Sequence, residues 1–262
     1  MNLREKLNNK VLEYILNKLA ALGLLVFTMC VCTIFGTGFD LYDFTESLSN
    51  IMFWSLICGY ALMTSVLIDL VSYKWREFTF KTSILLHCIA GYIVFIPFMG
   101  INFYSLIAGS VGALCAFIYA FSYYFLVRKK RLAWIFLLVI PLLLCIRIID
   151  FTAKEGWTEE KTKSSFLAEF ERFNGKNEIP ISLKKGDRVT TYISFNEKNG
   201  GGYGYHFLDN NGELVAMKQL EEAYGDYDTS AIQFKAKKTG IYRLVLTGDN
   251  LKGEMDVKWE ID

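Results

Sequence analysis

Apolar and polar residues are arranged differently in the two halves of this chain of 262 residues. The first half contains five long apolar stretches, each long enough for an α-helix to cross the roughly 30 Å hydrocarbon core of a bilayer. The stretches cover residues 19–35, 52–71, 82–98, 103–127 and 132–149. They predict an α-helical membrane domain with five transmembrane helices over residues 1–151.

The second half changes to alternation with a period of two, which is typical of strands that bury one face. The last strand is the clearest example, since Met255, Val257, Trp259 and Ile261 alternate with charged residues. Other runs of strand character cover 179–183, 189–195, 203–208, 214–217, 232–236 and 241–246, and turns rich in Gly and Asn separate them. The pattern predicts an all-β domain over 166–262, an antiparallel jelly-roll-like β-sandwich, after a juxtamembrane connector over 152–165.

The segments between the apolar stretches alternate between basic and non-basic. The basic segments contain Arg4, Lys6, Lys10 and Lys18, then Lys74, Arg76 and Lys81, then Arg128, Lys129, Lys130 and Arg131. The segments after the first and third stretches contain no Lys or Arg. Because cytoplasmic loops carry the excess of Lys and Arg, we expect a multi-pass protein of the cell membrane with a cytoplasmic N-terminus. Five crossings then place the C-terminal domain outside the cell.

The charge and the cysteine content limit the kinds of binding site that the chain can form. Residues 1–149 carry 12 basic against 7 acidic side chains, and residues 150–262 carry 16 against 20, so the near-neutral total is a cancellation. An acidic external domain argues against nucleic-acid binding, which favours a basic face. All six cysteines lie in the apolar stretches without metal-ligand spacing, so we expect no disulfide in the second half, no metal site built on cysteine and no cofactor.

Two ionisable residues inside the apolar stretches are candidates for function, because an intramembrane charge costs free energy unless it has a partner. Asp69 lies near the inner end of the second stretch, and His87 lies near the inner end of the third. Their similar depth predicts an Asp-His pair that carries a proton or senses pH. The alternative is structural: Asp69 reaches the inner interface, and His87 bonds a carbonyl or hydroxyl such as that of Ser83.

The fourth stretch carries small residues at helical spacing: Ser105, Gly109, Gly112, Ala113, Ala116 and Ala120. Small side chains let helix backbones approach closely in lipid. We expect this face to pack against neighbouring helices of the same chain. The alternative is a homo-oligomer formed through Ser105, Gly109, Gly112 and Ala116.

Two features of the external half are candidate binding sites. Tyr203, Tyr205 and His206 lie in a glycine-rich segment and would offer a stacking surface to a sugar or peptide, although a bulged hairpin also explains them. Oxygen-rich loops hold calcium, and Glu221, Glu222, Asp226 and Asp228 crowd one loop. Their spacing does not fit an EF-hand loop, which favours a solvated acidic loop.

The sequence KKTGIYRLVLTGDNLKGEMDVKWEI, preceded by YHFLDNNGELV, resembles the last strands of secreted sandwiches of the GOLD and bacterial pre-peptidase C-terminal kind. The resemblance covers about residues 164–262 and implies a non-catalytic binding or accessory role. It carries over no functional residues.

The external half has one histidine and no cysteine, which argues against a Ser-His-Asp or Cys-His catalytic site there and against an enzyme. We therefore expect a membrane protein that displays an external β-sandwich to bind an envelope protein or cell-wall polymer, or to sense the envelope. The alternative is a small transporter, or an accessory subunit of one, that uses Asp69 and His87.

Overall fold

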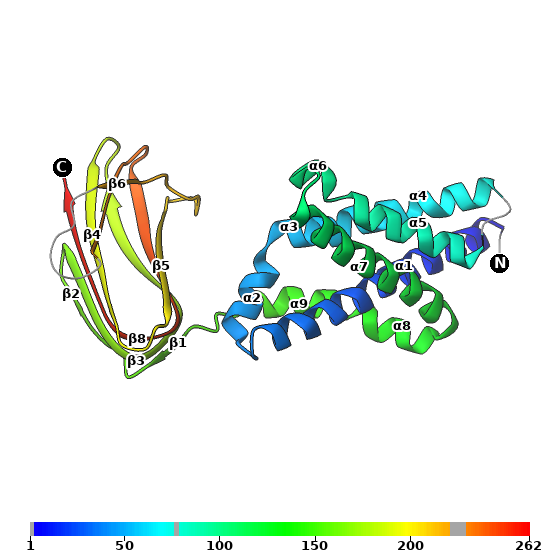
Figure 1. Ribbon diagram of the computed structural model, residues 1–262, viewed down its shortest axis with the longest axis horizontal. Coiled ribbons are helices and arrows are strands. Elements are labelled where there is room, and N and C mark those ends of the chain that lie inside the picture. Colours follow the sequence, from blue (N-terminus) through cyan, green and yellow to red (C-terminus); the bar gives the residue numbers. More distant parts are fainter. Residues whose placement is uncertain (1–2, 76–78, 221–228) are drawn as a thin grey trace. The chain divides into compact units, whose positions relative to one another are not determined.

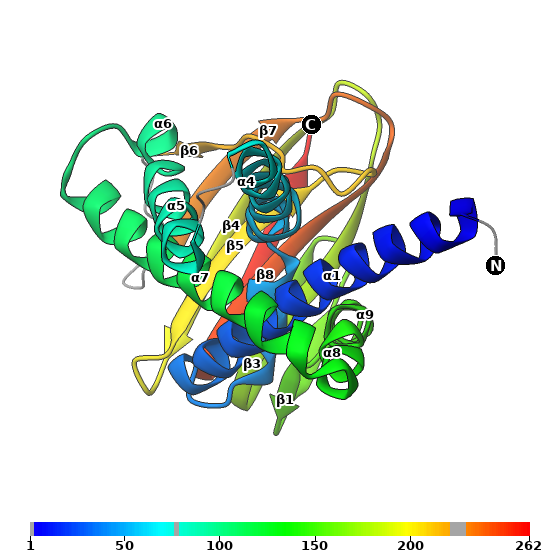
Figure 2. The same ribbon diagram turned by 90° about the vertical axis from the view of Figure 1, so that its right-hand side faces the viewer.

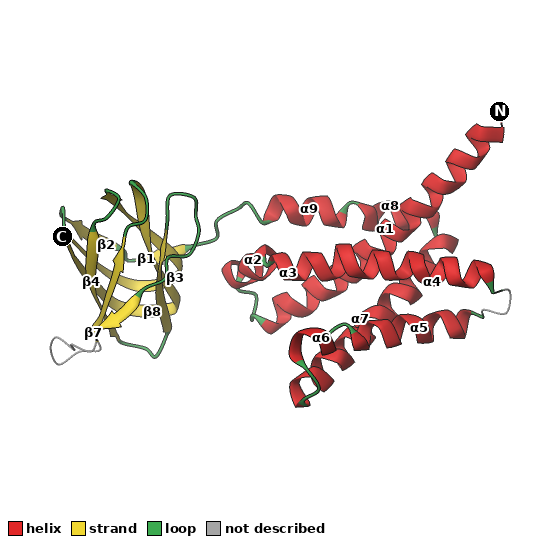
Figure 3. Ribbon diagram, turned by 90° about the horizontal axis from the view of Figure 1, so that it is seen from above, coloured by secondary structure: helices red, strands yellow, loops and turns green. Residues whose placement is uncertain are grey.

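The computed structural model describes residues 3–75, 79–220 and 229–262, with side chains from residue 8 onward. The chain divides into two compact units, Met1–Ile149 and Asp150–Asp262. Figure 3 shows that the first unit is helical and that the second consists of strands. The division confirms the helix-plus-sheet composition expected from the change in periodicity.

The helical unit is built from α1 (Leu3–Gly36), α2 (Leu41–Ser49), α3 (Ile51–Trp54), the π-helix η1 (Ser55–Ala61), α4 (Leu62–Lys74), α5 (Phe80–Ile93), α6 (Ile96–Met99), α7 (Phe103–Arg128), α8 (Lys130–Leu137) and α9 (Val139–Ile146). Helix α3, η1 and α4 follow one another without a break (Figure 1). Within the described ranges, four helical segments are long and apolar enough to cross a membrane: Asn8–Gly36, Ile51–Lys74, Phe80–Met99 and Phe103–Arg128.

The fifth predicted crossing is two short helices instead of one continuous helix, because the chain turns at Leu138 between α8 and α9. The cause lies in Pro141, which has no N–H to bond the carbonyl of residue 137 and whose ring crowds that carbonyl. The same effect of proline explains why α5 ends at Ile93, four residues before Pro97. The apolar stretches 82–98 and 132–149 contain Pro97 and Pro141, and their length alone predicted continuous helices.

Small residues set the closest helix crossing. Figure 2 shows α5 beside α7, and the two backbones meet where Gly91 faces Gly112. A Cβ atom added at Gly91 would overlap the carbonyl oxygen of Gly112, and the ring of Tyr92 covers Gly109. The small-residue stripe of α7 therefore packs within the chain at these glycines. Contact with a second copy at these glycines would require α5 to move away.

The described residues of the second unit form one antiparallel eight-stranded sheet. Its strands are β1 (Ala153–Glu155), β2 (Thr158–Lys161), β3 (Ser165–Leu183), β4 (Arg188–Glu197), β5 (Gly202–Leu208), β6 (Lys218–Leu220), β7 (Thr229–Lys235) and β8 (Gly240–Ile261). The order is β1-β3-β8-β4-β7-β6, with β2 also paired to β3 and β5 to β8. The predicted antiparallel all-β character is confirmed.

The two longest strands bend, and the bend lets one sheet enclose a core. The first half of β3 pairs with the second half of β8, whose other edge carries β4, whereas the first half of β8 carries β5. Register shifts between Phe170 and Gly175 in β3, and a positive φ of 143° at Gly253 in β8, mark the bend. Figure 1 shows β4 and β5 on opposite sides of this core. Across it, the rings of Phe207 and Phe234 lie 4.7 Å apart between centroids.

Three local expectations differ from the structure. Residues 152–165, predicted as a connector, contribute β1 and β2, and Trp157 between them stacks 5.4 Å from Phe170. Residues 214–217 form a single bridge, from Leu214 to Leu208, instead of a strand. The Gly and Asn residues at 248–250 bend β8 instead of ending it. Short charged runs and Gly-Asn segments occur both in turns and in edge strands. Whether such a segment forms a strand therefore depends on the strand available to pair with it.

Candidate functional site

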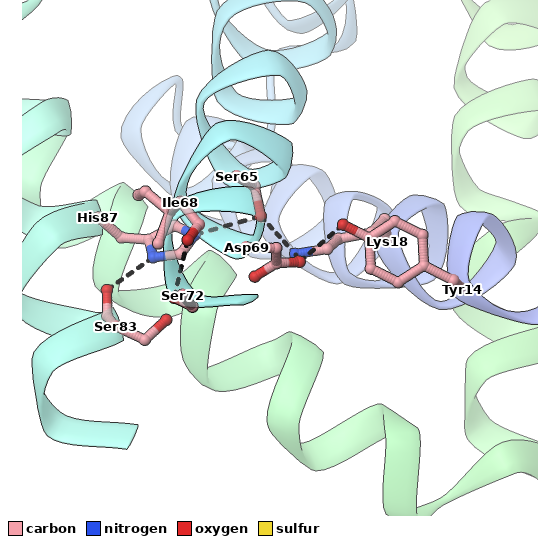
Figure 4. Close-up of polar contacts among 8 residues, drawn as sticks. All are labelled: Tyr14, Lys18, Ser65, Ile68, Asp69, Ser72, Ser83 and His87. Atoms are coloured by element: carbon pink, nitrogen blue, oxygen red, sulfur yellow. Dashed lines mark hydrogen bonds and ion pairs between the residues drawn. The ribbon is translucent and has the colours of Figure 1, made fainter. Parts of the chain in front are cut away.

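Three helices of the first unit, α1, α4 and α5, bring polar side chains together, and we call Tyr14, Lys18, Ser65, Asp69 and His87 the polar cluster (Figure 4). Lys18 on α1 lies at its centre. The Lys18 ammonium is 2.7 Å from Asp69 Oδ2 on α4 and donates to Ser65 Oγ at 2.6 Å. The Tyr14 hydroxyl donates to the same oxygen of Asp69 at 2.6 Å.

The charged pair is unevenly buried. The Lys18 side chain is 4% exposed, whereas that of Asp69 is 32% exposed. The ammonium also lies 4.1 Å from the ring centroid of Tyr123 on α7, within the range of a cation–π contact. A desolvated ammonium needs this many partners, because an unpaired charge in a low-dielectric interior is costly.

His87 on α5 joins the cluster through Ser65. Its Nδ1 lies 2.7 Å from the carbonyl oxygen of Ser83, which can only accept, so we assign a proton to Nδ1. Its Nε2 lies 3.2 Å from Ser65 Oγ. In the neutral ring Nε2 accepts from the Ser65 hydroxyl, while the ammonium of Lys18 donates to a lone pair of the same oxygen. The result is a continuous chain from Asp69 through Lys18 and Ser65 to His87.

The structure therefore places Asp69 and His87 in one cluster, but bridged by Lys18 and Ser65 instead of as a direct pair. The expected bond from His87 to the backbone of Ser83 is also present. Sequence reasoning missed Lys18 as a member of the cluster, because it counted Lys18 among the cytoplasmic charges. One signal was available: Tyr14 and Lys18 are four residues apart and share a helix face.

Two cavities meet at this cluster. The polar cavity, of about 160 Å³, is lined by Lys18, Ser65, Asp69, Ser72, Thr79, Ser83, Ile84, His87, Tyr119, Ala120, Tyr123 and Tyr124. The apolar cavity, of about 160 Å³ and partly open, lies between α1, η1, α5 and α7. His87 and Tyr119 line both. Tyr119 is 1% exposed, and its hydroxyl lies near Ser65 without a hydrogen bond of good geometry to any described residue.

The candidate surface on the β unit is divided between two faces of β5. Tyr203 and Tyr205 point to the side of the buried Phe207, and the Tyr203 ring stacks 4.4 Å from Phe195. Tyr205 packs against the core, and alternation along the strand directs His206 to the other face. The three side chains therefore do not form one continuous stacking surface.

The calcium candidates Glu221, Glu222, Asp226 and Asp228 lie outside the described residues. Within the described ranges, no group of three or more His, Cys, Asp or Glu side chains is arranged to hold a metal ion. Between the runs 203–208 and 214–217, the backbone N–H groups of Glu213 and Asn211 donate to the carboxylate of Asp209 and lower its pKa, as expected for a turn rich in Gly and Asn.

No protein-family model matches the sequence, and no curated protein matches it at a significant level. The resemblance of the C-terminal strands to GOLD and pre-peptidase C-terminal domains stays a prediction.

Proposed function

We propose that the chain is a multi-pass protein of the cell membrane with a cytoplasmic N-terminus, whose β unit lies outside the cell and binds a partner or polymer of the envelope. The observation that carries the proposal is the position of the basic segments. Lys130 forms an ion pair with Glu13 at 2.5 Å, which joins the start of α8 to the first part of α1. The rings of Phe80 and Tyr124, 4.0 Å apart, join the start of α5 to the end of α7. The described parts of the three basic segments thus gather at one end of the helical unit, as the positive-inside rule requires of cytoplasmic loops.

The path of α8 and α9 supports a fifth crossing despite the break at Leu138. Helix α8 starts beside Glu13 and crosses α1 closely where Gly23 faces the backbone of Phe136. Leu143 of α9 then belongs to the same apolar core as Leu25 and Phe44. The two short helices therefore follow α1 away from its basic end. The β unit, which begins at Asp150, would leave the membrane on the opposite side.

The β unit supports a binding role because it has a core of its own. Phe173, Phe207, Leu244 and Met255 are fully buried in that core. A domain with its own core can display loops and strand edges to partners without help from the helices. The proposed binding role holds whether the strands have the connectivity of the expected jelly-roll-like sandwich or that of another bent sheet.

Cysteine labelling tests the orientation. In a variant whose six native cysteines are replaced by alanine, we expect Lys185→Cys, in the exposed connection between β3 and β4, to react with a membrane-impermeant maleimide on intact cells. The matched variant Lys129→Cys, in the exposed connection between α7 and α8, should react only after the membrane is permeabilised. Labelling of the two positions in the reverse order would refute the proposed topology.

The binding role is tested by photocrosslinking. With a photoreactive maleimide at position 185, the same cells should yield crosslinks to envelope protein or wall polymer. Crosslinks to lipid alone would refute the binding role.

The polar cluster favours a second candidate function, a small transporter or accessory subunit that moves protons through Asp69 and His87. The supporting observation is the hydrogen-bonded chain that joins these residues through Lys18 and Ser65. Removal of residues 150–262 separates the two candidates. A transporter should keep part of its flux without them and lose it in a His87→Gln variant, whereas a binding protein should lose its function with the β unit and tolerate His87→Gln.

A further inference from the structure

The two cavities of the helical unit are arranged along the helices in a way that suits an amphiphile. Along α5 and its two capping residues, Thr79 and Ser83 line the polar cavity, and Ala90 and Val94, two to four turns further along, line the apolar cavity. Helix α7 runs in the opposite direction and has the opposite order: Val111 and Cys115 line the apolar cavity, and Tyr123 lines the polar one.

The helix before α5 repeats this order. Asp69 and Ser72 on α4 line the polar cavity, while Ile57 and Ala61 of the π-helix η1 line the apolar cavity. A π-helical turn inside an α-helix is rare and frequently lies at a functional site. Polar residues thus face one end of the helical unit, the end where its basic segments gather, and an apolar space extends from there toward the opposite end.

Tyr119 stands at the boundary between the cavities with an unsatisfied group. Its hydroxyl is buried and forms no hydrogen bond of good geometry with a described residue. A buried hydroxyl without a partner costs about 1–3 kcal/mol. Water or a ligand oxygen at this boundary would remove that cost. Among the described residues the boundary is shared only with His87, whose Nδ1 and Nε2 are both bonded.

The charge of the site limits the head group. Lys18 and Asp69 are the charged residues that line the polar cavity within the described ranges, and they neutralise each other. An anionic head would compete with Asp69 for the ammonium, and a cationic head would compete with Lys18 for the carboxylate. Hydroxyl groups of Ser72, Thr79 and Ser83 complete the wall. An uncharged, hydroxylated head fits this lining without breaking the ion pair.

From this arrangement we propose that the helical unit binds an amphiphile with an uncharged, hydroxylated head group. Its long apolar chain occupies the space between α1, η1, α5 and α7, and its head lies beside Tyr119, Ser83 and Asp69. The proposal does not depend on what the β unit binds.

Photocrosslinking of the full chain in detergent tests the proposal. The probe is a long-chain monoacylglycerol that carries a diazirine and an alkyne on its chain, compared with the fatty acid and the phosphatidylcholine of the same chain. We expect the monoacylglycerol to label residues of the apolar cavity, such as Cys115, and to be competed by unlabelled monoacylglycerol. Equal labelling of these residues by phosphatidylcholine would show that ordinary bilayer lipid fills the space, and would overturn the proposal. Stronger labelling by the fatty acid would also overturn it.

Variants locate the two parts of the site. Tyr119→Phe removes only the hydroxyl at the boundary and should weaken monoacylglycerol labelling about fivefold, the effect of one neutral hydrogen bond. Because that hydroxyl has no good partner in the free protein, the variant should unfold at the same temperature as the wild type or higher. Tyr104→Phe, an exposed position on the same helix, is the matched control and should label normally.

Ala61→Phe fills the apolar cavity from η1 and should abolish labelling at Cys115. Its control is Met63→Phe, which adds a ring at a position that is 68% exposed and outside the cavity lining. Labelling that persists in Ala61→Phe, or that is unchanged in Tyr119→Phe, would overturn the proposal.

Discussion

Replacement of Asp69 by Asn should lower the free energy of unfolding of the helical unit by about 3–5 kcal/mol, since it removes the charge that neutralises a buried ammonium. The Lys18 side chain is only 4% exposed, so its charge would remain largely desolvated without a counter-ion. Thermal unfolding of the full chain in detergent measures the loss. The loss should be larger than that of Lys18→Met, because Asp69 is 32% exposed and keeps access to water.

The double variant Lys18→Met, Asp69→Asn should recover much of this stability, because neither charge is then left alone. Lys130→Met is the control: its ion pair with Glu13 is exposed by 72% and 52%, and such surface pairs contribute at most about 1 kcal/mol. If Asp69→Asn cost no more than Lys130→Met, the cluster would not hold a desolvated pair.

Substitution of Gly91 by Ala should destabilise the helical unit by about 3 kcal/mol, although alanine is the better helix former. A methyl group there would overlap the carbonyl oxygen of Gly112 and come within 2.8 Å of the Cβ of Ala116. Both contacts lie on α7, and backbone cannot move aside as a flexible side chain can. Helices α5 and α7 would have to separate, which would also alter the apolar cavity that they line.

Gly59→Ala is the matched control for this prediction. Gly59 lies in η1 of the same unit, and a Cβ atom added there meets no atom within 4 Å. The control should be neutral or slightly stabilising in the same detergent unfolding measurement. A Gly91→Ala variant that behaves like Gly59→Ala would mean that α5 and α7 do not cross at their glycines.

The division of the chain was predictable from periodicity, because helices and strands bury their apolar faces at different spacings. The helix breaks at Leu138 and Ile93 were harder to predict, because the apolar composition continues through each break and only Pro141 and Pro97 mark it. In the β unit, Val257 and Trp259 are buried, as expected from alternation. Whether residues 248–250 turn or bend depended on the partner strand, which local sequence does not contain.

The polar cluster shows a different limit of sequence reasoning. The depth of Asp69 and His87 was readable from their distance to the basic loops, and both do lie in one cluster. The connection through Lys18 could not be predicted, because Lys18 belongs to a helix far away in sequence. Its charge was already explained as one of the basic residues on the cytoplasmic side. Lys18 contributes both to the positive charge that orients the chain and to an ion pair. The sequence pattern indicated only the first role, because it is the more common one.

The long bent strands of the β unit have a mechanical consequence. Because β3 and β8 each run through both halves of the sheet, the two halves share a continuous backbone and neither can swing away as a separate leaf. A partner that pulled on β5 would load β8 directly and, through its second half, β4. The unit should therefore respond to force or binding as one elastic body, with its compliance concentrated at the bend marked by Gly175 and Gly253.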